Sequence, residues 1–154
     1  MATTAALRIL VDADACPVKD EIYRVALRHD VAVVIVSNQR IRIPGHPLVT
    51  REVVSGAFDA ADDWIAETAS PRDVVITGDI LLADRALKAG ATVIAPTGKP
   101  FTTASIGGAV ATRAIMADLR AGIESFGGPP PFGKADRSRF LQALDAALVR
   151  LKRC

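Results

Sequence analysis

The segment RILVDADACPVKDE, residues 8–21, decides the fold class. It opens with branched apolar side chains that predict a buried strand, and Asp12 and Asp14 follow this strand directly. Pro17 then predicts the start of a helix, where the missing N–H of proline does no harm. Ligands of open α/β sheets bind beyond the carboxyl ends of the strands, and neighbouring carboxylates repel each other unless a cation or a proton lies between them. The segment therefore predicts a site for a hard metal ion.

Strand-like and helix-like segments alternate along the rest of the chain, which predicts an α/β fold. We expect a three-layer α/β/α sandwich with a mostly parallel central sheet, formed by one domain of residues 1–154. The expected strands after the first are residues 31–36, 48–54, 73–79 and 91–96. The expected helices are residues 17–28, 58–69, 80–90, 104–122 and 137–151. A segment rich in proline and glycine, residues 126–135, is expected to connect the last two helices.

Composition limits the class of protein. Half of the 154 residues are hydrophobic but only 5% are aromatic, which predicts an aliphatic core. The longest purely apolar run, residues 31–36, is far too short to span a membrane, and no secretory signal is evident. Cys16 and Cys154 lie near opposite ends of the chain and have no zinc-type spacing, so we expect reduced thiols and a cytoplasmic protein. Cys16 lacks an evident base partner, so its role stays open.

Aspartates follow several of the predicted strands or begin the helices after them. Asp12, Asp14 and Asp79 are the candidate catalytic residues, because two of the central strands end at them. Asp62 and Asp63, at the start of the helix 58–69, complete the candidate metal ligands. Oxygen ligands of this kind suit Mg²⁺ or Mn²⁺. Each aspartate taken alone is equally typical of a helix cap.

Two further groups of residues are candidates for binding a phosphate-bearing substrate. Free N–H groups at a helix entrance can receive phosphate, and small or hydroxyl residues gather at the predicted start of the helix 104–122. The candidates there are Lys99, Thr102, Thr103, Ser105 and, further along the helix, Arg113. An ordinary loop with a Ser or Thr cap is the alternative.

The second group lies at the start of the last helix, where Arg137 and Arg139 flank Ser138. Arginine forks suit phosphates, and a modest basic patch is the usual footprint of a nucleic-acid contact. Solvated surface arginines are the alternative. Phe132 and Phe140, nearby, could stack on bases or pack into the core.

Several segments together resemble the YaiI/YqxD family of uncharacterised bacterial proteins. They are RILVDADACPVKDE (8–21), GAFDAADDWI (56–65), VVITGDILLADRALKAGA (74–91), GGPPPF (127–132) and DRSRFLQALD (136–145), and the resemblance covers essentially the whole chain. This family is similar in its expected fold to PIN-like nuclease domains, which gather acidic residues around Mg²⁺ or Mn²⁺ to cut RNA.

The PIN-like resemblance implies roles for individual residues. Asp12 matches the acid of the first strand, and Asp79 matches the acid of a T-x-D pattern that begins at Thr77. Asp62 or Asp63 would replace the acid found in the middle of PIN-like domains. Leu81 stands where PIN nucleases often have another acid.

Three functions follow as alternatives. The first is a metal-dependent nuclease or phosphodiesterase acting on RNA. The second is a phosphatase of the haloacid-dehalogenase kind, with Asp12 as covalent nucleophile; its closing motif would need an acid one residue before Asp84, and no lysine lies between Asp20 and Asp79. The third is a non-catalytic module that binds nucleic acid, which Leu81 favours.

Overall fold

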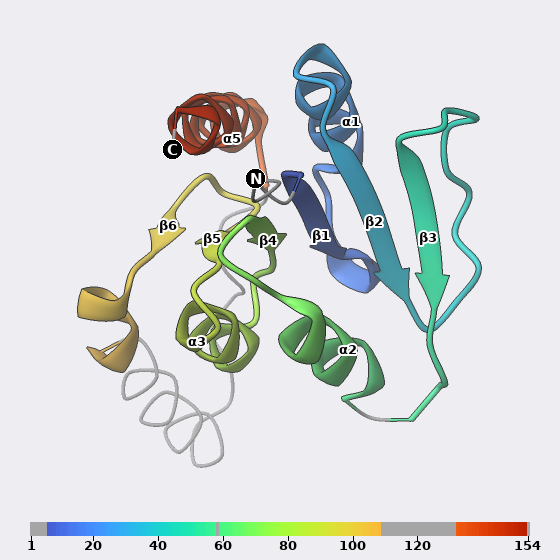
Figure 1. Ribbon diagram of the computed structural model, residues 1–154, viewed down its shortest axis with the longest axis horizontal. Helices are drawn as coiled ribbons and strands as arrows, with labels where there is room; N and C mark the ends of the chain where they lie inside the picture. Colours follow the sequence, from blue (N-terminus) through green and yellow to red (C-terminus); the bar gives the residue numbers. More distant parts are fainter. Residues whose placement is uncertain (1–5, 58, 109–131, 154) are drawn as a thin grey trace, which may run out of the picture.

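The computed structural model describes residues 6–57, 59–108 and 132–153 (Figure 1). The strands are β1 (Arg8–Asp12), β2 (Ala32–Ser37), β3 (Val49–Val53), β4 (Asp73–Ile76), β5 (Thr92–Ile94) and β6 (Pro100–Phe101). The helices are the 3-10 turn η1 (Ala13–Ala15), α1 (Lys19–Arg28), α2 (Ala60–Thr68), α3 (Ile80–Lys88) and α5 (Lys134–Lys152). Residues 103–108 are also helical.

The strands form one sheet in the order β3-β2-β1-β4-β5-β6. All neighbouring strands are parallel except β5 and β6, which are antiparallel. The chain adds β2 and β3 on one side of β1 and then returns to add β4 and β5 on the other side. The order therefore reverses between β1 and β4, and such a switch point leaves a crevice at the carboxyl ends of the strands.

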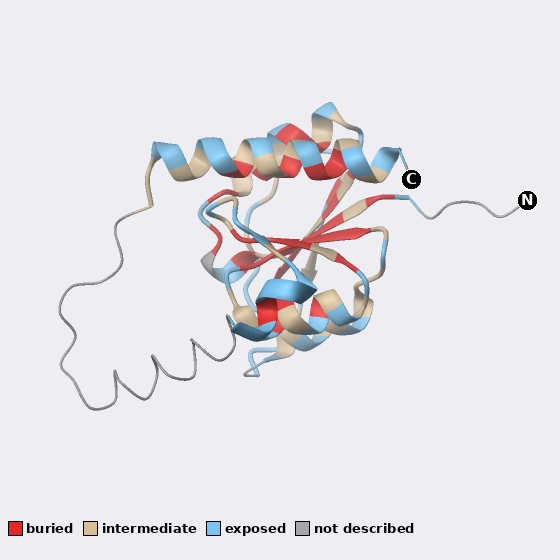
Figure 2. Ribbon diagram, turned by 90° about the vertical axis from the view of Figure 1, so that its left-hand side faces the viewer, coloured by how far each residue is buried: buried red, intermediate tan, exposed pale blue. Residues whose placement is uncertain are grey.

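Helices cover both faces of the sheet, which confirms the three-layer α/β/α sandwich. In Figure 1, α1 and α5 lie on one face and α2 and α3 on the other. Side chains of a strand point alternately to its two faces, so Ile9 and Val11 join the cluster under α1 and α5 whereas Leu10 joins the cluster under α2 and α3. Figure 2 shows the buried residues gathered in the strands and on the inner sides of the helices. This two-sided burial explains why the strands read as continuous apolar runs.

The predicted strands and helices are present among the described residues, but several of them begin or end at other residues than expected. The strand expected at 73–79 ends at Ile76, and the helix expected from Pro17 begins only at Lys19. β6 lies between the expected strand 91–96 and the expected helix 104–122, where we expected no strand or helix. The last helix begins earlier than expected, at Lys134, because Asp136 Oδ2 accepts a hydrogen bond from the N–H of Gly133 (2.9 Å) and so closes its first turn.

Parts of two expectations lie outside the described residues. Of the helix expected at 104–122, only residues up to 108 are described, and these are helical. Of the connector expected at 126–135, residues 132–133 are described as irregular, and helix α5 follows them. Within the described residues, no helix is long and apolar enough to cross a membrane.

Candidate functional site

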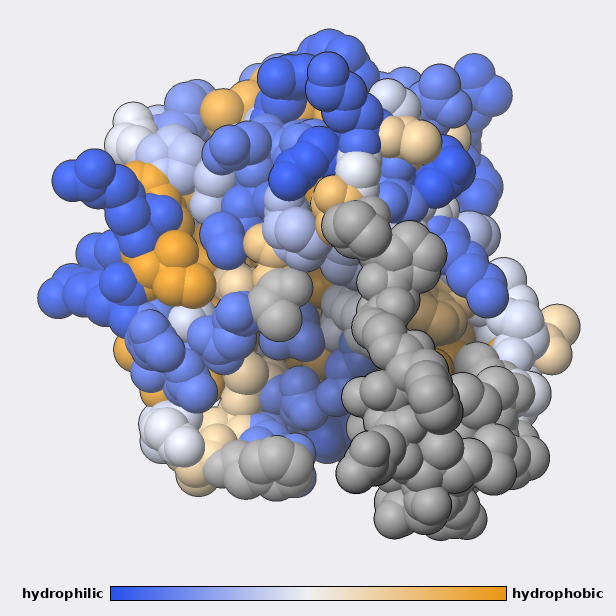
Figure 3. Space-filling view, turned by 180° about the vertical axis from the view of Figure 1, so that it is seen from behind, coloured by the Kyte–Doolittle hydropathy of each residue, from blue (hydrophilic) through white to orange (hydrophobic). Residues whose placement is uncertain are grey.

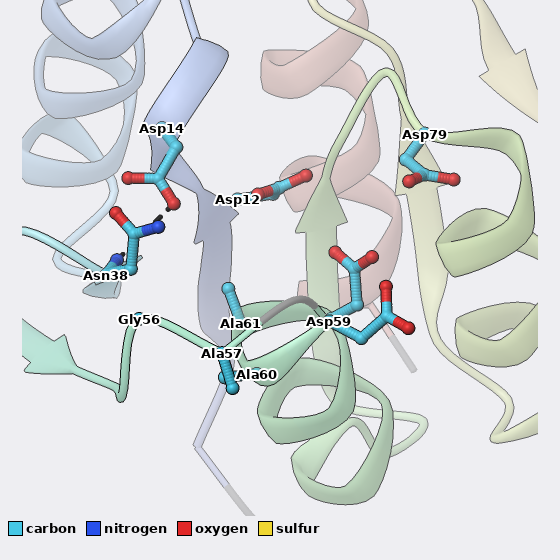
Figure 4. A pocket seen from close by; sticks show the side chains of 10 residues that line it. Asp12, Asp14, Asn38, Gly56, Ala57, Asp59, Ala60, Ala61 and Asp79 are labelled. Atoms are coloured by element: carbon cyan, nitrogen blue, oxygen red, sulfur yellow. Dashed lines mark hydrogen bonds between the residues drawn. The ribbon is translucent and has the colours of Figure 1, made fainter.

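A pocket of about 360 Å³ opens at the carboxyl edge of the sheet, beside the switch point (Figure 4). Its described lining is acidic, with small residues at the entrance to α2. The lining residues are Asp12, Asp14, Asn38, Gly56, Ala57, Asp59, Ala60, Ala61, Asp62 and Asp79. The aspartates come from β1, η1, α2 and the turn before α3, so folding brings together carboxylates that are far apart in the sequence.

Asp12 ends β1 and is held by a buried hydroxyl. Its Oδ2 accepts a hydrogen bond from Thr77 Oγ1 at 2.9 Å, and Thr77 is only 1% exposed. Burial raises the pKa of Asp12, the Thr77 hydrogen bond opposes this rise, and the charges of Asp79 and Asp14 add to it. The carboxylate therefore lies in a field of like charges that disfavours its ionised form.

Asp79 is both a helix cap and a pocket residue. Its Oδ1 accepts hydrogen bonds from the N–H groups of Leu81 (2.9 Å) and Leu82 (3.3 Å), which is the geometry of an N-cap. Its own N–H donates to Thr77 Oγ1 at 3.0 Å. No described residue donates a hydrogen bond to Oδ2, so capping and a ligand role are compatible in this side chain.

Asp14 lies on η1 and turns away from Asp12. Its Oδ1 accepts a hydrogen bond from Ser37 Oγ at 2.7 Å, and its Oδ2 accepts one from the N–H of Asn38 at 3.3 Å. In Figure 4 the Asp14 carboxylate points toward Asn38, whereas Asp12 extends toward Asp79. Asp14 thus ties η1 to the end of β2 at the rim of the pocket.

Helix α2 contributes Asp62 to the pocket and Asp63 to the surface. Burial, followed by the charges of Asp79, Asp12 and Asp59, raises the pKa of Asp62 to about 6, and Arg85 opposes this rise. Asp63 instead forms an exposed ion pair with Arg85 at 2.8 Å. Asp59, directly before α2, also lines the pocket and has the left-handed conformation (φ 70°).

The carboxylates do not form a finished coordination shell. Among the described residues, no three His, Cys, Asp or Glu side chains converge closely enough to hold a metal ion. The hydrogen bonds of Asp14 to β2 account for part of this, because they hold its carboxylate on the far side of the pocket from Asp79 (Figure 4). The described residues thus form an acidic pocket whose carboxylates repel one another.

Comparison with known proteins places the chain in a family. The family described as "Uncharacterized BCR, YaiI/YqxD family" matches residues 10–150. The chain belongs to the YaiI/YqxD family. No solved structure matches it significantly.

Curated relatives in this family match nearly the full length of the chain. A UPF0178 protein of Sphingopyxis alaskensis is 75% identical over 146 residues, which is 94% of this chain and 95% of the relative. A UPF0178 protein of Nitrobacter winogradskyi is 60% identical over 96% of this chain and 94% of the relative. The UPF0178 protein bll3966 of Bradyrhizobium diazoefficiens is 59% identical over 98% and 90%, respectively.

The described residues of the first candidate group for phosphate binding do not line the acidic pocket of this YaiI/YqxD family member. Thr102 and Ser105 cap the helical residues 103–108 reciprocally: Thr102 Oγ1 accepts from the N–H of Ser105 (3.1 Å), and Ser105 Oγ accepts from the N–H of Thr102 (3.2 Å). Thr102 and Thr103 line a separate hollow of about 470 Å³. Lys99 is exposed on the turn between β5 and β6. Arg113 lies outside the described residues.

The arginines of the second group bind within the protein. Arg137 Nη1 donates to the carbonyl oxygen of Pro17 (2.7 Å) and to Glu21 Oε1 (3.0 Å), which fastens α5 to α1. Its guanidinium also lies over the ring of Phe132, 5.1 Å from the centroid. Arg139 forms an ion pair with Asp136 at 2.6 Å. These contacts give both arginines a structural role.

One aromatic side chain, Phe140, and one thiol, Cys16, pack in the protein core and do not line the pocket. Phe140 is fully buried against the cluster under α1 and α5, so of the two uses left open it serves core packing. Cys16 is 7% exposed, and burial raises the pKa of its thiol. A thiol with a raised pKa is a poor nucleophile near neutral pH.

Sequence reasoning missed residues that hold the pocket together. Ser37 and Asn38 lie just beyond the expected strand 31–36; Ser37 ends β2 and Asn38 follows it, at the same edge of the sheet as Asp12. Thr77 entered the sequence analysis only as the first residue of the T-x-D pattern, although a hydroxyl two residues before Asp79 at a strand end is a signal for a hydrogen bond to a neighbouring acid. Asp62 lies three residues before the buried Ile65, on the same face of α2, and this spacing separates it from Asp63.

Proposed function

We propose that this YaiI/YqxD family member is a divalent-cation-dependent phosphodiesterase that cleaves RNA at the acidic pocket. One observation carries the proposal: Asp12, Asp62 and Asp79, from three separate elements, line one pocket at the switch point of the sheet. Burial, with a further contribution from the charges of the neighbouring aspartates, raises the pKa of Asp12 and Asp62. Carboxylates with raised pKa values that lie close together in a ligand crevice are typical of a functional site.

The donor set fits Mg²⁺ or Mn²⁺. The pocket offers carboxylate oxygens and no described sulfur or imidazole ligand, which suits hard cations. Mg²⁺ keeps several waters and is usually bound by one or two carboxylates together with substrate phosphates, so the pocket does not need three converging ligands before substrate binds. One or two of Asp12, Asp62 and Asp79 would hold the ion together with the substrate phosphate, and the ion would polarise a phosphoryl oxygen and supply hydroxide near neutral pH.

The remaining pocket residues position these acids. Thr77 fixes one oxygen of Asp12 and the backbone of Asp79, which keeps the two carboxylates directed at the same space. Asp14 holds the start of the β2–β3 loop at the rim of the pocket. RNA is the proposed substrate because of the resemblance to PIN-like nuclease domains. A cytoplasmic location would suit such an enzyme and stays a prediction.

The phosphatase alternative finds less support in the pocket. Haloacid-dehalogenase chemistry needs a lysine beside the phosphoryl group, and no lysine or arginine is among the described lining residues. Asp84, the acid nearest to the closing motif, pairs with Lys88 at 3.1 Å on α3. The non-catalytic alternative differs from the proposal in a measurable way, because it requires neither metal nor Asp12.

Thermal unfolding with and without Mn²⁺, together with an RNA cleavage assay, tests the proposal. A ligand that binds only the folded state at about 100 times its Kd adds about 2.7 kcal/mol of stability, so millimolar Mn²⁺ should raise the Tm of the wild type. Asp12→Asn and Asp62→Asn should lose both this rise and the cleavage of single-stranded RNA.

Asp63→Asn is the matched control, since it removes a neighbouring carboxylate that lies outside the pocket, and it should keep both properties. A wild type that shows no Tm response to Mn²⁺ contradicts the proposal. A wild type that cleaves no RNA in Mn²⁺, with an affinity for RNA that persists in Asp12→Asn without metal, selects the non-catalytic module instead.

A further inference from the structure

In the loop between β2 and β3, two arginines alternate with two isoleucines. Residues 40–43 read Arg-Ile-Arg-Ile; Ile41 and Ile43 pack against the hydrophobic cluster under α1 and α5, whereas Arg40 and Arg42 are exposed. Arg51 of β3 donates from Nη1 to the carbonyl oxygen of Ile41 at 3.0 Å and so fastens the loop to the edge strand. The partly buried isoleucines therefore direct both arginines to the outside of the β3 edge.

The loop that carries these two arginines starts at the acidic pocket. Asn38, at the start of the loop, lines the pocket and is bound to Asp14 through its N–H. An extended chain advances at most about 3.6 Å per residue, so the Cα atoms of Arg40 and Arg42 lie within about 7 Å and 14 Å of that of Asn38. Figure 3, in which the β3 edge is on the left, shows hydrophilic side chains projecting from this edge around a small hydrophobic area.

Arg40 and Arg42 differ from the other arginines considered for substrate binding. Arg137 and Arg139 are engaged with Glu21 and Asp136, whereas no described residue forms an ion pair or side-chain hydrogen bond with Arg40 or Arg42. Free guanidinium groups bind phosphate oxygens in a bidentate manner. Exposed side chains two residues apart on an extended chain follow one line, which suits the phosphates of a single strand.

The acidic pocket creates the need for such cations. Five aspartates line it and no described basic residue does, so its field repels a polyanion. A bound metal ion offsets this repulsion only at the scissile phosphate, and the neighbouring phosphates require positive charge beside the pocket. No aromatic residue is among the described lining residues, so base stacking offers no alternative source of affinity there.

We infer that Arg40 and Arg42 form an arginine strip that binds consecutive backbone phosphates of single-stranded RNA leading into the acidic pocket. This inference rests on the proposed function and adds the surface that holds the substrate. The strip contacts phosphates rather than bases, so binding is strongly dependent on salt and nearly independent of sequence.

Binding of a fluorescent single-stranded RNA tests the strip without catalysis. The Asp12→Asn protein in Mg²⁺ is compared with the same protein carrying Arg40→Gln and Arg42→Gln. We expect the double variant to bind about tenfold more weakly, and the slope of log K against log salt to shrink by about 1.4, because each phosphate contact with a single strand contributes about 0.7. Lysine at both positions should restore most of the affinity.

The control carries Arg24→Gln and Arg153→Gln, which remove the same charge from exposed positions on α1 and after α5. Equal affinity and equal salt slope in the strip variant and the control overturn the inference, as does a parent protein that binds no RNA. Thermal unfolding of every variant verifies that the fold is kept.

Hydrolysis by proteins with Asp12 intact separates this inference from the proposed function. With Mn²⁺, the strip variant should cleave a small diester such as bis(p-nitrophenyl) phosphate like the wild type but show an RNA KM raised about tenfold at similar kcat. Equal loss on both substrates contradicts a strip that touches only the polymer. A wild type that hydrolyses neither substrate contradicts the proposed function alone, and the binding comparison still decides the strip.

Discussion

Thr77 donates a hydrogen bond from its buried hydroxyl to Asp12 Oδ2 across 2.9 Å. Thr77 Oγ1 in turn accepts a hydrogen bond from the N–H of Asp79 at 3.0 Å. A single hydroxyl thus sets the positions of two carboxylates that repel each other, one at the end of β1 and one at the start of α3. The hydrogen bond also limits the rise in the pKa of Asp12 that burial causes.

Replacing Thr77 by valine should weaken both the fold and the metal response. Valine nearly conserves the volume of threonine but leaves the N–H of Asp79 and one oxygen of Asp12 without this partner, and an unsatisfied buried group costs about 1–3 kcal/mol. We expect chemical unfolding to show a loss of this size, together with a smaller Mn²⁺-induced rise in Tm. Thr77→Ser keeps the hydroxyl and is the control; equal behaviour of the serine and valine variants would contradict the assigned role.

Asp62 should make the metal-free protein less stable as pH rises. Its pKa is about 6 in the folded protein, against an ordinary value of 3.8, so the folded state binds more protons than the unfolded state between these values. The free energy of unfolding therefore falls from about pH 4 to about pH 6, and the full penalty persists above that range. Allowing for the solvent that reaches this side chain, the penalty is about 1 kcal/mol.

Asp62→Asn removes this penalty. In EDTA at pH 7 the variant should be more stable than the wild type by about 1 kcal/mol, and at pH 4 the two should be nearly equal. Unfolding by urea across this pH range measures both differences. Asp63→Asn, which loses only an exposed ion pair, should change stability by less than about 0.5 kcal/mol at either pH. A stability gain for Asp62→Asn that is the same at both pH values would point to a cause other than ionisation.

The central sheet was predictable because both of its faces are covered. Residues 8–12, 32–37 and 73–76 are buried on two sides, so they read as apolar runs long enough to recognise. β6 was not predictable, because it has only two residues, begins with Pro100 and pairs antiparallel at an edge. Proline is tolerated in such edge positions but gives no strand signal.

The pocket was predictable where strand ends alone define it. Asp12 and Asp79 follow neighbouring parallel strands, so the topology brings them to one edge of the sheet. Asp14 was equally prominent in the sequence, yet Ser37 and Asn38, residues more than twenty positions away, decide the direction of its carboxylate. Such long-range hydrogen bonds leave no local pattern in the chain.

Gly98 should be one of the least replaceable residues outside the pocket. It has a φ of +90°, and a Cβ at this position would lie 2.6 Å from the carbonyl carbon of Arg139 in α5. Gly98→Ala therefore combines an unfavourable backbone conformation with a clash against helix backbone, and we expect a loss of about 2–4 kcal/mol in urea unfolding. Gly45→Ala is the matched control, since nothing lies within 4 Å of its added Cβ, and it should change stability by less than about 0.5 kcal/mol. Equal stability of the two variants would mean that α5 does not lie against this turn.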